Sequence, residues 1–143
     1  MTENMDPNFV GDDASEEQDI YRENILDHYK HPHNKKRLDV CDIQHKEHNP
    51  VCGDQIEIFI RFEDGQGKLS RKIIDAGFDG NGCAISQASV SMLTDKIIGM
   101  TVDEIMMVTR EDVLSMLGIP IGVVRQKCAL LSLKAVQRGI EKV

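Results

Sequence analysis

The chain has 143 residues, of which 41% are hydrophobic and 29% are charged, a composition that suits one globular domain. No apolar run approaches the roughly 20 residues that a membrane-spanning helix needs, and the first residues lack the basic-then-apolar pattern of a secretion signal. We therefore expect a cytoplasmic protein with no membrane partner. Aromatic residues make up only 4% of the chain, and beyond residue 19 its basic and acidic residues balance, so we also expect no nucleic-acid partner.

Negative charge is concentrated at the N-terminus. The first 19 residues contain seven acidic residues and no Lys or Arg, which accounts for the whole net charge of −7. Residues 1–18 mix these acids with Asn, Gly, Pro and Ser and show no helical or strand periodicity. We predict a disordered acidic tail over 1–18, followed by a single domain over 19–143.

Alternating apolar residues predict a β-hairpin in the middle of the chain. Residues 55–63 alternate isoleucine with polar residues, apart from Phe59 on the polar face, which predicts a strand with one buried side. A turn at 64–67 and an apolar stretch from Leu69 to Phe78 complete the antiparallel pair.

The rest of the chain is predicted to be mostly helical. The first helix is expected to start near Asp19, to carry one apolar stripe and to end before the proline that follows it. Residues 33–49 are polar and are expected to form a loop, with a short strand near 40–43. Thr101 and Glu104 form the capping-box pattern that opens a helix. The other predicted helices span about 84–98, 112–117 and 126–141.

Four cysteines are present, and we expect them to be reduced. Cys52 lies in a tight turn, and Cys83 follows a Gly-Asn-Gly sequence between the hairpin and a helix. Cys128 is expected to open the last helix. Because free N–H groups at a helix start favour a thiolate, lowered pKa values are predicted for Cys83 and Cys128. Cys41 lies in a polar loop without such a context and is interpreted as a spare thiol.

Together with Asp54, the thiols of Cys52, Cys83 and Cys128 form a candidate set of metal ligands. Thiolates are ligands of zinc and of iron–sulfur clusters. A carboxylate exchanges more readily than a fourth thiolate, so the set suits a site that releases its metal. The spacing alone leaves two alternatives open, because no close Cys-x-x-Cys pair is present. These alternatives are three unconnected buried cysteines and a purely structural zinc site.

Four segments resemble those of the NifU/IscU/SufU-type scaffolds on which iron–sulfur clusters are assembled. They occur in the same order and with comparable spacing, and the resemblance covers about residues 20–142. The segments are Tyr-Arg-Glu-Asn-Ile-Leu-Asp-His-Tyr-Lys-His-Pro-His-Asn (21–34), Asn-Pro-Val-Cys-Gly-Asp (49–54), Asp-Gly-Asn-Gly-Cys-Ala-Ile-Ser (79–86) and Arg-Gln-Lys-Cys-Ala (125–129). The resemblance implies an α+β fold: a small antiparallel three-stranded sheet with helices packed on one face, its third strand at 40–48.

The resemblance also implies a site and its chemistry. The metal and cluster ligands would be Cys52, Asp54, Cys83 and Cys128, with Cys128 and Cys52 as candidate sulfur acceptors. A cysteine desulfurase of the IscS, SufS or NifS type would supply sulfur for a transient [2Fe-2S] cluster, and apo iron–sulfur proteins would accept that cluster. Zn²⁺ can occupy the same thiolate ligands.

Two positions depart from the IscU type. Lys127 stands where IscU-type scaffolds carry a histidine before the last cysteine. Ile121-Gly-Val-Val-Arg125 replaces the Leu-Pro-Pro-Val-Lys segment that an Hsp70-type chaperone recognises, which puts chaperone recognition by that route in doubt. The Arg-Gln-Lys-Cys sequence ending at Cys128 instead resembles the SufU type, whose members bind zinc and relay persulfide sulfur. However, only 44 residues separate Cys83 from Cys128, which is the IscU-like spacing.

Roles are also predicted for residues outside the ligand set, namely Lys127, Arg125 and the histidines. Lys127 is expected to attract a persulfide or sulfide, and its alternative role is that of a solvated lysine at the helix start. Arg125 is expected to contact the desulfurase or to hold Asp54 by a charge-assisted bond. The five histidines lack metal-ligand spacing, so solvated or capping roles are predicted for them. His28 and His31 belong to the family-like opening segment and could help to dock a partner.

The sequence leaves three functions from different classes open. The favoured one is a cluster assembly scaffold, which carries chemistry without being an enzyme in the strict sense. The alternative is a zinc-dependent sulfurtransferase that relays persulfide sulfur by thiol exchange, and the third is a structural zinc domain that acts as an interaction module. Lys127 and Arg125 favour the second function, whereas the spacing from Cys83 to Cys128 favours the first. Asp54 argues against the third, because structural zinc sites mostly use Cys and His.

Overall fold

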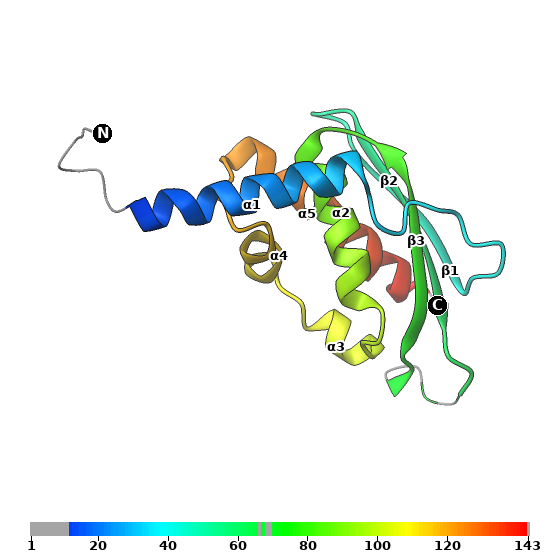
Figure 1. Cartoon of the computed structure of the whole chain (residues 1–143). Coiled ribbons are helices and arrows are strands. Elements are labelled where there is room, and N and C mark those ends of the chain that lie inside the picture. Colours follow the sequence, from blue (N-terminus) through cyan, green and yellow to red (C-terminus); the bar gives the residue numbers. More distant parts are fainter. Residues whose placement is uncertain (1–11, 66, 68–69, 143) are drawn as a thin grey trace.

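The computed structural model describes residues 12–65, 67 and 70–142. In these residues a three-stranded antiparallel sheet lies against a layer of helices (Figure 1). Three sequence predictions fall at least partly on residues that are not described: the tail over 1–11, Gln66 in the hairpin turn and the strand start at Leu69. The elements are α1 (Asp12–Lys30), β1 (Ile43–Asn49), β2 (Asp54–Phe62), β3 (Ile73–Asn81), α2 (Ala84–Ile97), α3 (Val102–Met106), α4 (Arg110–Leu117) and α5 (Val123–Glu141).

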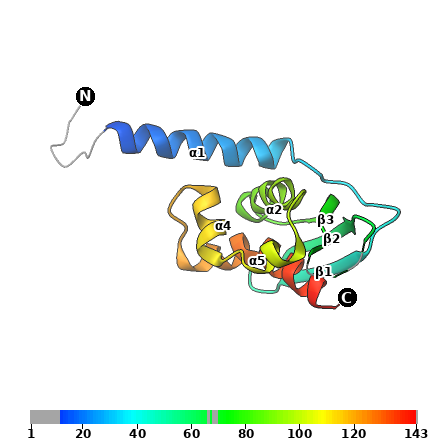
Figure 2. The same ribbon diagram turned by 90° about the horizontal axis from the view of Figure 1, so that it is seen from below.

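The sheet has the strand order β1-β2-β3, and each strand is antiparallel to the next. α5 packs across β1 and β2, and α2 packs along β3, on the same side of the sheet (Figure 2). This confirms the predicted α+β fold with helices on one face. The strand that the resemblance implies at 40–48 is β1, which runs over Ile43–Asn49 rather than near 40–43.

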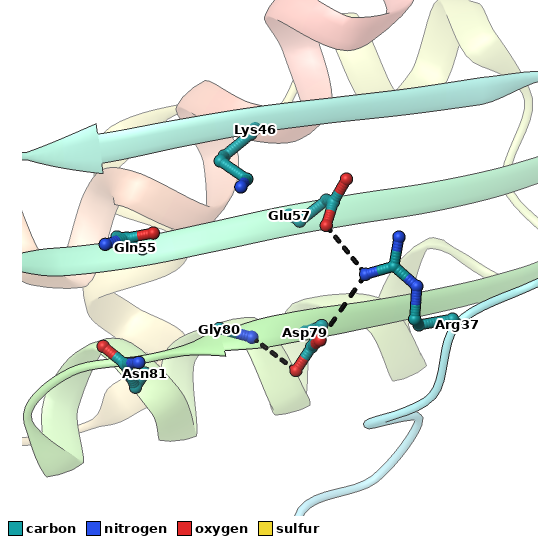
Figure 3. Close-up of a pocket in the computed structure, with 7 residues that line it drawn as sticks. All are labelled: Arg37, Lys46, Gln55, Glu57, Asp79, Gly80 and Asn81. Carbon is teal, nitrogen blue, oxygen red and sulfur yellow. Dashed lines mark hydrogen bonds and ion pairs between the residues drawn. The ribbon is translucent and has the colours of Figure 1, made fainter.

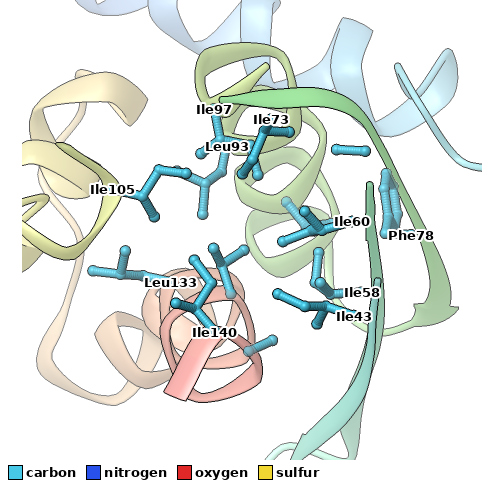
Figure 4. Close-up of a cluster of buried hydrophobic side chains, with 14 of the residues drawn as sticks. Ile43, Ile58, Ile60, Ile73, Phe78, Leu93, Ile97, Ile105, Leu133 and Ile140 are labelled. Atoms are coloured by element: carbon cyan, nitrogen blue, oxygen red, sulfur yellow. The ribbon is translucent and has the colours of Figure 1, made fainter. Parts of the chain in front are cut away.

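The buried core lies between the sheet and these two helices (Figure 4). Alternation along β2 turns Ile56, Ile58 and Ile60 inward, and all three are fully buried. They share one apolar cluster with Leu93 of α2 and Ile140 of α5. Burial of an isoleucine side chain contributes roughly 1.5–3 kcal/mol, so this cluster fixes how α2 and α5 lie on the sheet.

β1 is the element that sequence periodicity misses. Its side chains alternate between buried and exposed positions, but after Ile43 the inward positions are held by His45, Glu47 and Asn49. His45 Nε2 and Glu47 Oε2 form a hydrogen bond of 2.6 Å with each other. Because polar residues face inward, the composition of this strand is that of a loop.

α5 supplies the charges that this polar strand requires. Glu47 lies 3.9 Å from Lys134 and 3.6 Å from Arg138. Burial opposes the ionisation of Glu47, but the bond to His45 and the two cations outweigh it and hold the pKa of Glu47 below its usual value. Gly139 allows the close approach of α5, because a Cβ at that position would overlap side chains of β1.

The segment after α1 crosses the opposite, polar face of the sheet. Phe59, the exception in the alternation of β2, is buried there, and the Arg37 guanidinium lies 4.7 Å from the centre of its ring. The same guanidinium bonds to Glu57 at 2.9 Å and lies 3.5 Å from Asp79, at the edge of an open polar hollow of about 280 Å³ (Figure 3). The segment thus shields one apolar side chain on a largely polar face.

The two long helices, α1 and α5, begin earlier than the sequence predicts. α1 begins at Asp12 rather than near Asp19. α5 begins at Val123 rather than at Gln126, after the N-cap Gly122. Glycine is a tolerated N-cap residue but offers no side chain that could cap the first amides, so the sequence marks this start only weakly.

The short helix α3 begins where the sequence predicts, whereas α4 begins at Arg110 rather than at Asp112. Thr101 and Glu104 form the predicted capping box, in which Glu104 N–H donates to Thr101 Oγ1 at 3.2 Å and the carboxylate accepts from the Thr101 amide at 2.9 Å. Thr109 and Asp112 form a second capping box, which opens α4. These reciprocal bonds satisfy amides that would otherwise have no partner.

α1 buries only part of its predicted apolar stripe, together with one histidine. Ile25 and His28, one turn apart, are buried, and His28 bonds to α2. Ile20, Leu26 and Tyr29 are largely exposed. Within the described residues, no helix combines the length and the apolar character that crossing a bilayer demands.

Two adjacent isoleucines on β3 test the orientation of the sheet. Ile73 is 1% exposed in the core, whereas Ile74 is 49% exposed on the other face. Ile73→Ala is expected to lower the free energy of unfolding by roughly 2–5 kcal/mol because it leaves a cavity, and Ile74→Ala by at most about 1 kcal/mol. Urea denaturation measures both, and equal losses would contradict the orientation of β3.

Candidate metal centre

The turn between β1 and β2 presents Cys52 to solvent. The Asn49 side-chain oxygen accepts a hydrogen bond from the Val51 amide at 3.2 Å, and the Gly53 amide donates to the Asn49 carbonyl at 2.8 Å. These two bonds fold the segment into a tight turn. Cys52, between the two bonded amides, remains exposed.

Three of the four predicted ligands lie together at this end of the sheet. Cys128 Sγ lies 3.1 Å from Cys52 Sγ, and the ligand atoms of Cys52, Asp54 and Cys128 all lie within 4.8 Å of one another. The two cysteines are free thiols, since the sulfur atoms of a disulfide would be about 2.05 Å apart. The group therefore offers two sulfur donors and one oxygen donor to the same point in space.

Asp54, the first residue of β2, is only 1% exposed. Its Oδ1 accepts a hydrogen bond from the Cys83 amide at 3.0 Å, whereas Oδ2 is buried and has no hydrogen-bond partner among the described residues. A buried carboxylate oxygen without a partner is costly unless a cation or a proton meets it. The donors present here therefore fit a thiophilic metal ion.

Cys83 is next to this group but does not complete it. It is the N-cap of α2, with a partly exposed side chain, and its amide is bonded to Asp54. Its sulfur is not among the donors that lie within 4.8 Å of one another. Its side chain has to turn toward the other three ligands to join them, which is a movement that binding of a metal can drive.

Cys128 lies deeper than predicted. Because α5 begins at Val123, Cys128 occupies the second turn of the helix and is only 2% exposed. Burial, followed by its contacts with Asp54 and Cys52, raises the pKa of the Cys128 thiol. The prediction that a helix start lowers this pKa is therefore wrong. Without a cation the sulfur keeps its proton, and a bound metal takes the place of that proton.

The sequence match extends over nearly the whole described chain. Residues 20–143 match the sequence model of the NifU-like N terminal domain. The chain belongs to this family. The match begins within α1 and includes the four predicted ligands, so the NifU-like assignment covers the site as well as the fold.

Relatives in this NifU-like family carry two kinds of name. The chain is 34% identical over 144 residues to the zinc-dependent sulfurtransferase SufU of Bacillus subtilis, which covers 86% of this chain and 90% of the relative. It is 33% identical over 123 residues to the iron-sulfur cluster assembly scaffold protein IscU 1 of Archaeoglobus fulgidus, and this match covers 85% of this chain and 74% of the relative. The fold is also similar to a solved structure, that of the putative iron-sulfur cluster assembly scaffold protein for the SUF system of Fervidobacterium islandicum. The TM-score is 0.68 at 27% sequence identity, and the match covers 86% of this chain and 98% of the solved one.

Arg125 and Lys127 are both exposed on the first turns of α5. No hydrogen bond or ion pair joins Arg125 to Asp54 in the described part of this NifU-like chain, so the predicted charge-assisted bond is not formed. Asp54 is instead bonded to the Cys83 amide. Lys127 is adjacent in sequence to Cys128 and is free to meet an anionic partner.

A cleft next to Cys128 is a feature that sequence reasoning missed. It has a volume of about 430 Å³ and is lined by four apolar residues, two lysines, a histidine and an asparagine: Pro50, Val51, Leu130, Leu131, Lys127, Lys134, His48 and Asn49. Asn49 connects it to the site, since its Nδ2 lies 3.9 Å from Cys128 Sγ. The Asn-Pro pair marks a turn in the sequence, but only the fold shows that this side chain reaches a thiol.

Cys41 is not part of the metal-ligand group among the described residues. Its side chain is half-buried, and burial raises the pKa of its thiol. A protonated, half-buried thiol is a poor metal ligand, which agrees with the interpretation of Cys41 as a spare cysteine.

Two histidines are not solvated as predicted. His28 and His45 are each 8% exposed, and they bond to Ser91 and Glu47 respectively. His28 therefore has little surface to offer a docking partner, whereas His31 remains exposed. His28 lies three residues after the buried Ile25, so the helical period could have placed it inward.

Gly82 tests the position of the Asp54 carboxylate. A Cβ at residue 82 would overlap the Asp54 carboxylate and the Ser86 hydroxyl, so Gly82→Ala is expected to weaken Zn²⁺ binding roughly 10–100-fold. Gly122→Ala is the matched control, because a Cβ there meets nothing within 4 Å. Competition against a chromophoric zinc chelator measures both affinities. Equal affinities for the two variants would show that the carboxylate does not hold the ion.

Proposed function

We propose that this chain is an iron–sulfur cluster assembly scaffold, which accepts sulfur from a cysteine desulfurase, combines it with iron and passes the cluster to acceptor proteins. The observation that carries the proposal is the convergence of Cys52, Asp54 and Cys128 into one group with an unpaired, buried carboxylate oxygen. Relatives named as IscU scaffolds support it. In the full proposal, Cys83 completes the ligand set and the cargo is a [2Fe-2S] cluster.

Cys52 is the thiol that we assign as the first sulfur acceptor. It is exposed, whereas Cys128 is only 2% exposed. The Cys52 thiolate attacks the outer sulfur of the desulfurase persulfide, a new S–S bond forms as the old one breaks, and the desulfurase cysteine leaves as a thiolate. The sulfur is thus transferred without net oxidation or reduction. Lys127 provides positive charge near the thiols for the anionic persulfide.

Iron and sulfide are the substrates of this site, and the ligand types explain why it could release its product. Thiolates hold iron strongly, while the Asp54 carboxylate is a harder ligand that exchanges more readily. Cys52 lies on a turn at the surface, so an acceptor thiol can approach the cluster from that side. The scaffold therefore combines two internal anchors, Asp54 and Cys128, with an open side.

The second candidate function is a zinc-dependent sulfurtransferase. It is favoured by the Arg-Gln-Lys-Cys sequence at 125–128 and by the similarity to a relative named SufU. Cys52, Asp54, Cys83 and Cys128 would hold the zinc ion, which would keep the thiols deprotonated. Cys52 would then carry sulfur on its own, without assembling a cluster.

The surface around Cys128 is the side on which we place the desulfurase and the acceptor proteins. Lys127 precedes Cys128 and lines the cleft, and Arg125 is exposed three residues before Cys128 on α5. Recognition by an Hsp70-type chaperone is not part of the proposal, because residues 121–125 do not carry the Leu-Pro-Pro-Val-Lys sequence.

Anaerobic reconstitution distinguishes the two functions. The metal-stripped chain is incubated with ferrous iron, cysteine and a desulfurase, and visible absorption is recorded. We expect the charge-transfer bands of a bound cluster, and their loss in Cys52→Ser, Cys83→Ser and Cys128→Ser. Cys41→Ser is the matched control and is expected to load normally. Zinc-dependent acceleration of the desulfurase without a bound cluster would assign the sulfurtransferase function instead, and loss of loading in Cys41→Ser would overturn the ligand assignment.

Asp54 is expected to control release more than assembly. In Asp54→Ala the harder ligand is lost, so we expect transfer to an apo-ferredoxin to slow several-fold while the amount of cluster assembled changes less. Asp54→Asn is the companion variant, because it keeps an oxygen that can accept the Cys83 amide but removes the charge. Stopped-flow kinetics measure the rate of cluster transfer. Unchanged transfer rates in both variants would contradict the role of Asp54 in cluster release.

A further inference from the structure

A second group of metal-ligand side chains lies at the junction of α1, the loop after it and α2. The ligand atoms of His28, His33 and Asp95 all lie within 4.8 Å of one another. His28 is in the last turn of α1, His33 is in the loop, and Asp95 is in the last turn of α2. Asp95 lies twelve residues along α2 from Cys83, a rise of about 18 Å, so this group is separate from the thiols.

We propose that His28, His33 and Asp95 form a binding site for one divalent first-row transition-metal ion. Two imidazoles and one carboxylate with open positions are a donor set suited to ions such as Fe²⁺, Co²⁺ or Zn²⁺. The proposal is independent of the proposed function, because it uses no thiol and no partner protein. It also differs from the prediction of solvated or capping roles for these histidines.

Hydrogen bonds hold the histidines in a fixed arrangement. The Ser91 hydroxyl bonds to His28 Nδ1 at 2.7 Å and accepts the His33 amide at 2.8 Å. No hydrogen bond among the described residues uses His28 Nε2, which leaves this nitrogen for a metal ion. A metal-bound imidazole commonly uses its other nitrogen in such a bond, and this bond orients the ring.

Asp95 is oriented in the same way. Asn34 Nδ2 donates to Asp95 Oδ1 at 2.9 Å and to Thr94 Oγ1 at 3.1 Å. The second carboxylate oxygen, Oδ2, faces His33 Nδ1 at 2.5 Å. A metal ion would take the place of the proton that these two atoms share, without disturbing the Asn34 bond.

The distances and the local charge are compatible with a bound ion. Donor atoms on one ion, each about 2.0–2.2 Å from it, lie up to about 4 Å apart, so small side-chain rotations bring the three donors together. The rings of His28 and His33 have their centres 4.4 Å apart. Both α1 and α2 end near the group, and the partial negative charge of a helix C-terminus favours a cation.

Exposure makes the site accessible from solvent. The side chains of His33 and Asp95 are 48% and 46% exposed, whereas His28 forms the buried floor. A bound ion would fasten the loop and the end of α1 to α2. It would therefore stabilise the folded chain in proportion to the occupancy of the site.

Cobalt titration of the full chain tests the proposal. One equivalent of Zn²⁺ first fills the thiol site, and Co²⁺ is then added while visible absorption and thermal unfolding are followed. We expect one further ion per chain, with d–d bands but without thiolate-to-cobalt charge-transfer bands, and a rise in the unfolding temperature. His33→Ala and Asp95→Asn are each expected to weaken this binding at least about tenfold, in line with removal of a ligand.

Two exposed residues of the same loop supply matched controls. His31→Ala and Asp39→Asn remove the same chemical groups outside the cluster and are expected to bind Co²⁺ as the unaltered chain does. Absence of a second saturable ion would overturn the proposal, as would equal losses in His31→Ala and His33→Ala. Cobalt that binds only with thiolate charge-transfer bands would also overturn it, while leaving the thiol site and the scaffold function intact.

Discussion

The hydrogen bond from the Cys83 amide to the Asp54 carboxylate joins the beginning of β2 to the N-cap of α2. β2 and β3 are paired at this end, so the bond fastens the helix directly to the end of the hairpin. It uses one carboxylate oxygen and leaves the other without a hydrogen-bond partner in the part of the chain that the structure describes. The same side chain thus closes the fold and supplies the oxygen donor of the site, and Gly82 is small enough to leave room for it.

The thiols are attached to elements of unequal depth. Cys128 is held on α5, whose apolar side is packed against the sheet, and it is almost inaccessible to solvent. Cys52 is on a surface turn, and Cys83 is at a helix start with a partly exposed side chain. A site built in this way has a fixed inner donor and adjustable outer donors. In the proposed function, an incoming ion or sulfur atom would therefore meet the outer thiols before the inner one.

Elements with strong local signals could be predicted from the sequence, and elements stabilised by distant partners could not. The Ile56-Ile58-Ile60 alternation and the Thr101–Glu104 capping box each depend on neighbours within a few residues. β1 depends on α5 for its charge balance, through Lys134 and Arg138. No local pattern contains that information.

The candidate site also has features that the sequence predicts and features that it does not. The choice of the four candidate ligands follows from motifs and from resemblance, whereas the grouping of three of them comes from packing. The burial of Cys128 depends on where α5 starts, and Gly122 marks that start only weakly because it has no capping side chain. The partners of His28 and His33 lie about sixty residues away on α2, so their grouping with Asp95 emerges only in the folded chain.

The polar character of β1 has a further consequence for how the protein behaves in concentrated solution. β1 is an edge strand of the sheet, and no strand of the described residues lies beside its outer backbone groups. An exposed edge invites other chains to add strands and so to aggregate, and natural proteins counter this with charged side chains, including inward-pointing ones. β1 carries such charges, with Lys46 on its exposed side and Glu47 facing inward. The composition that hides this strand from periodicity analysis also keeps neighbouring molecules from extending the sheet.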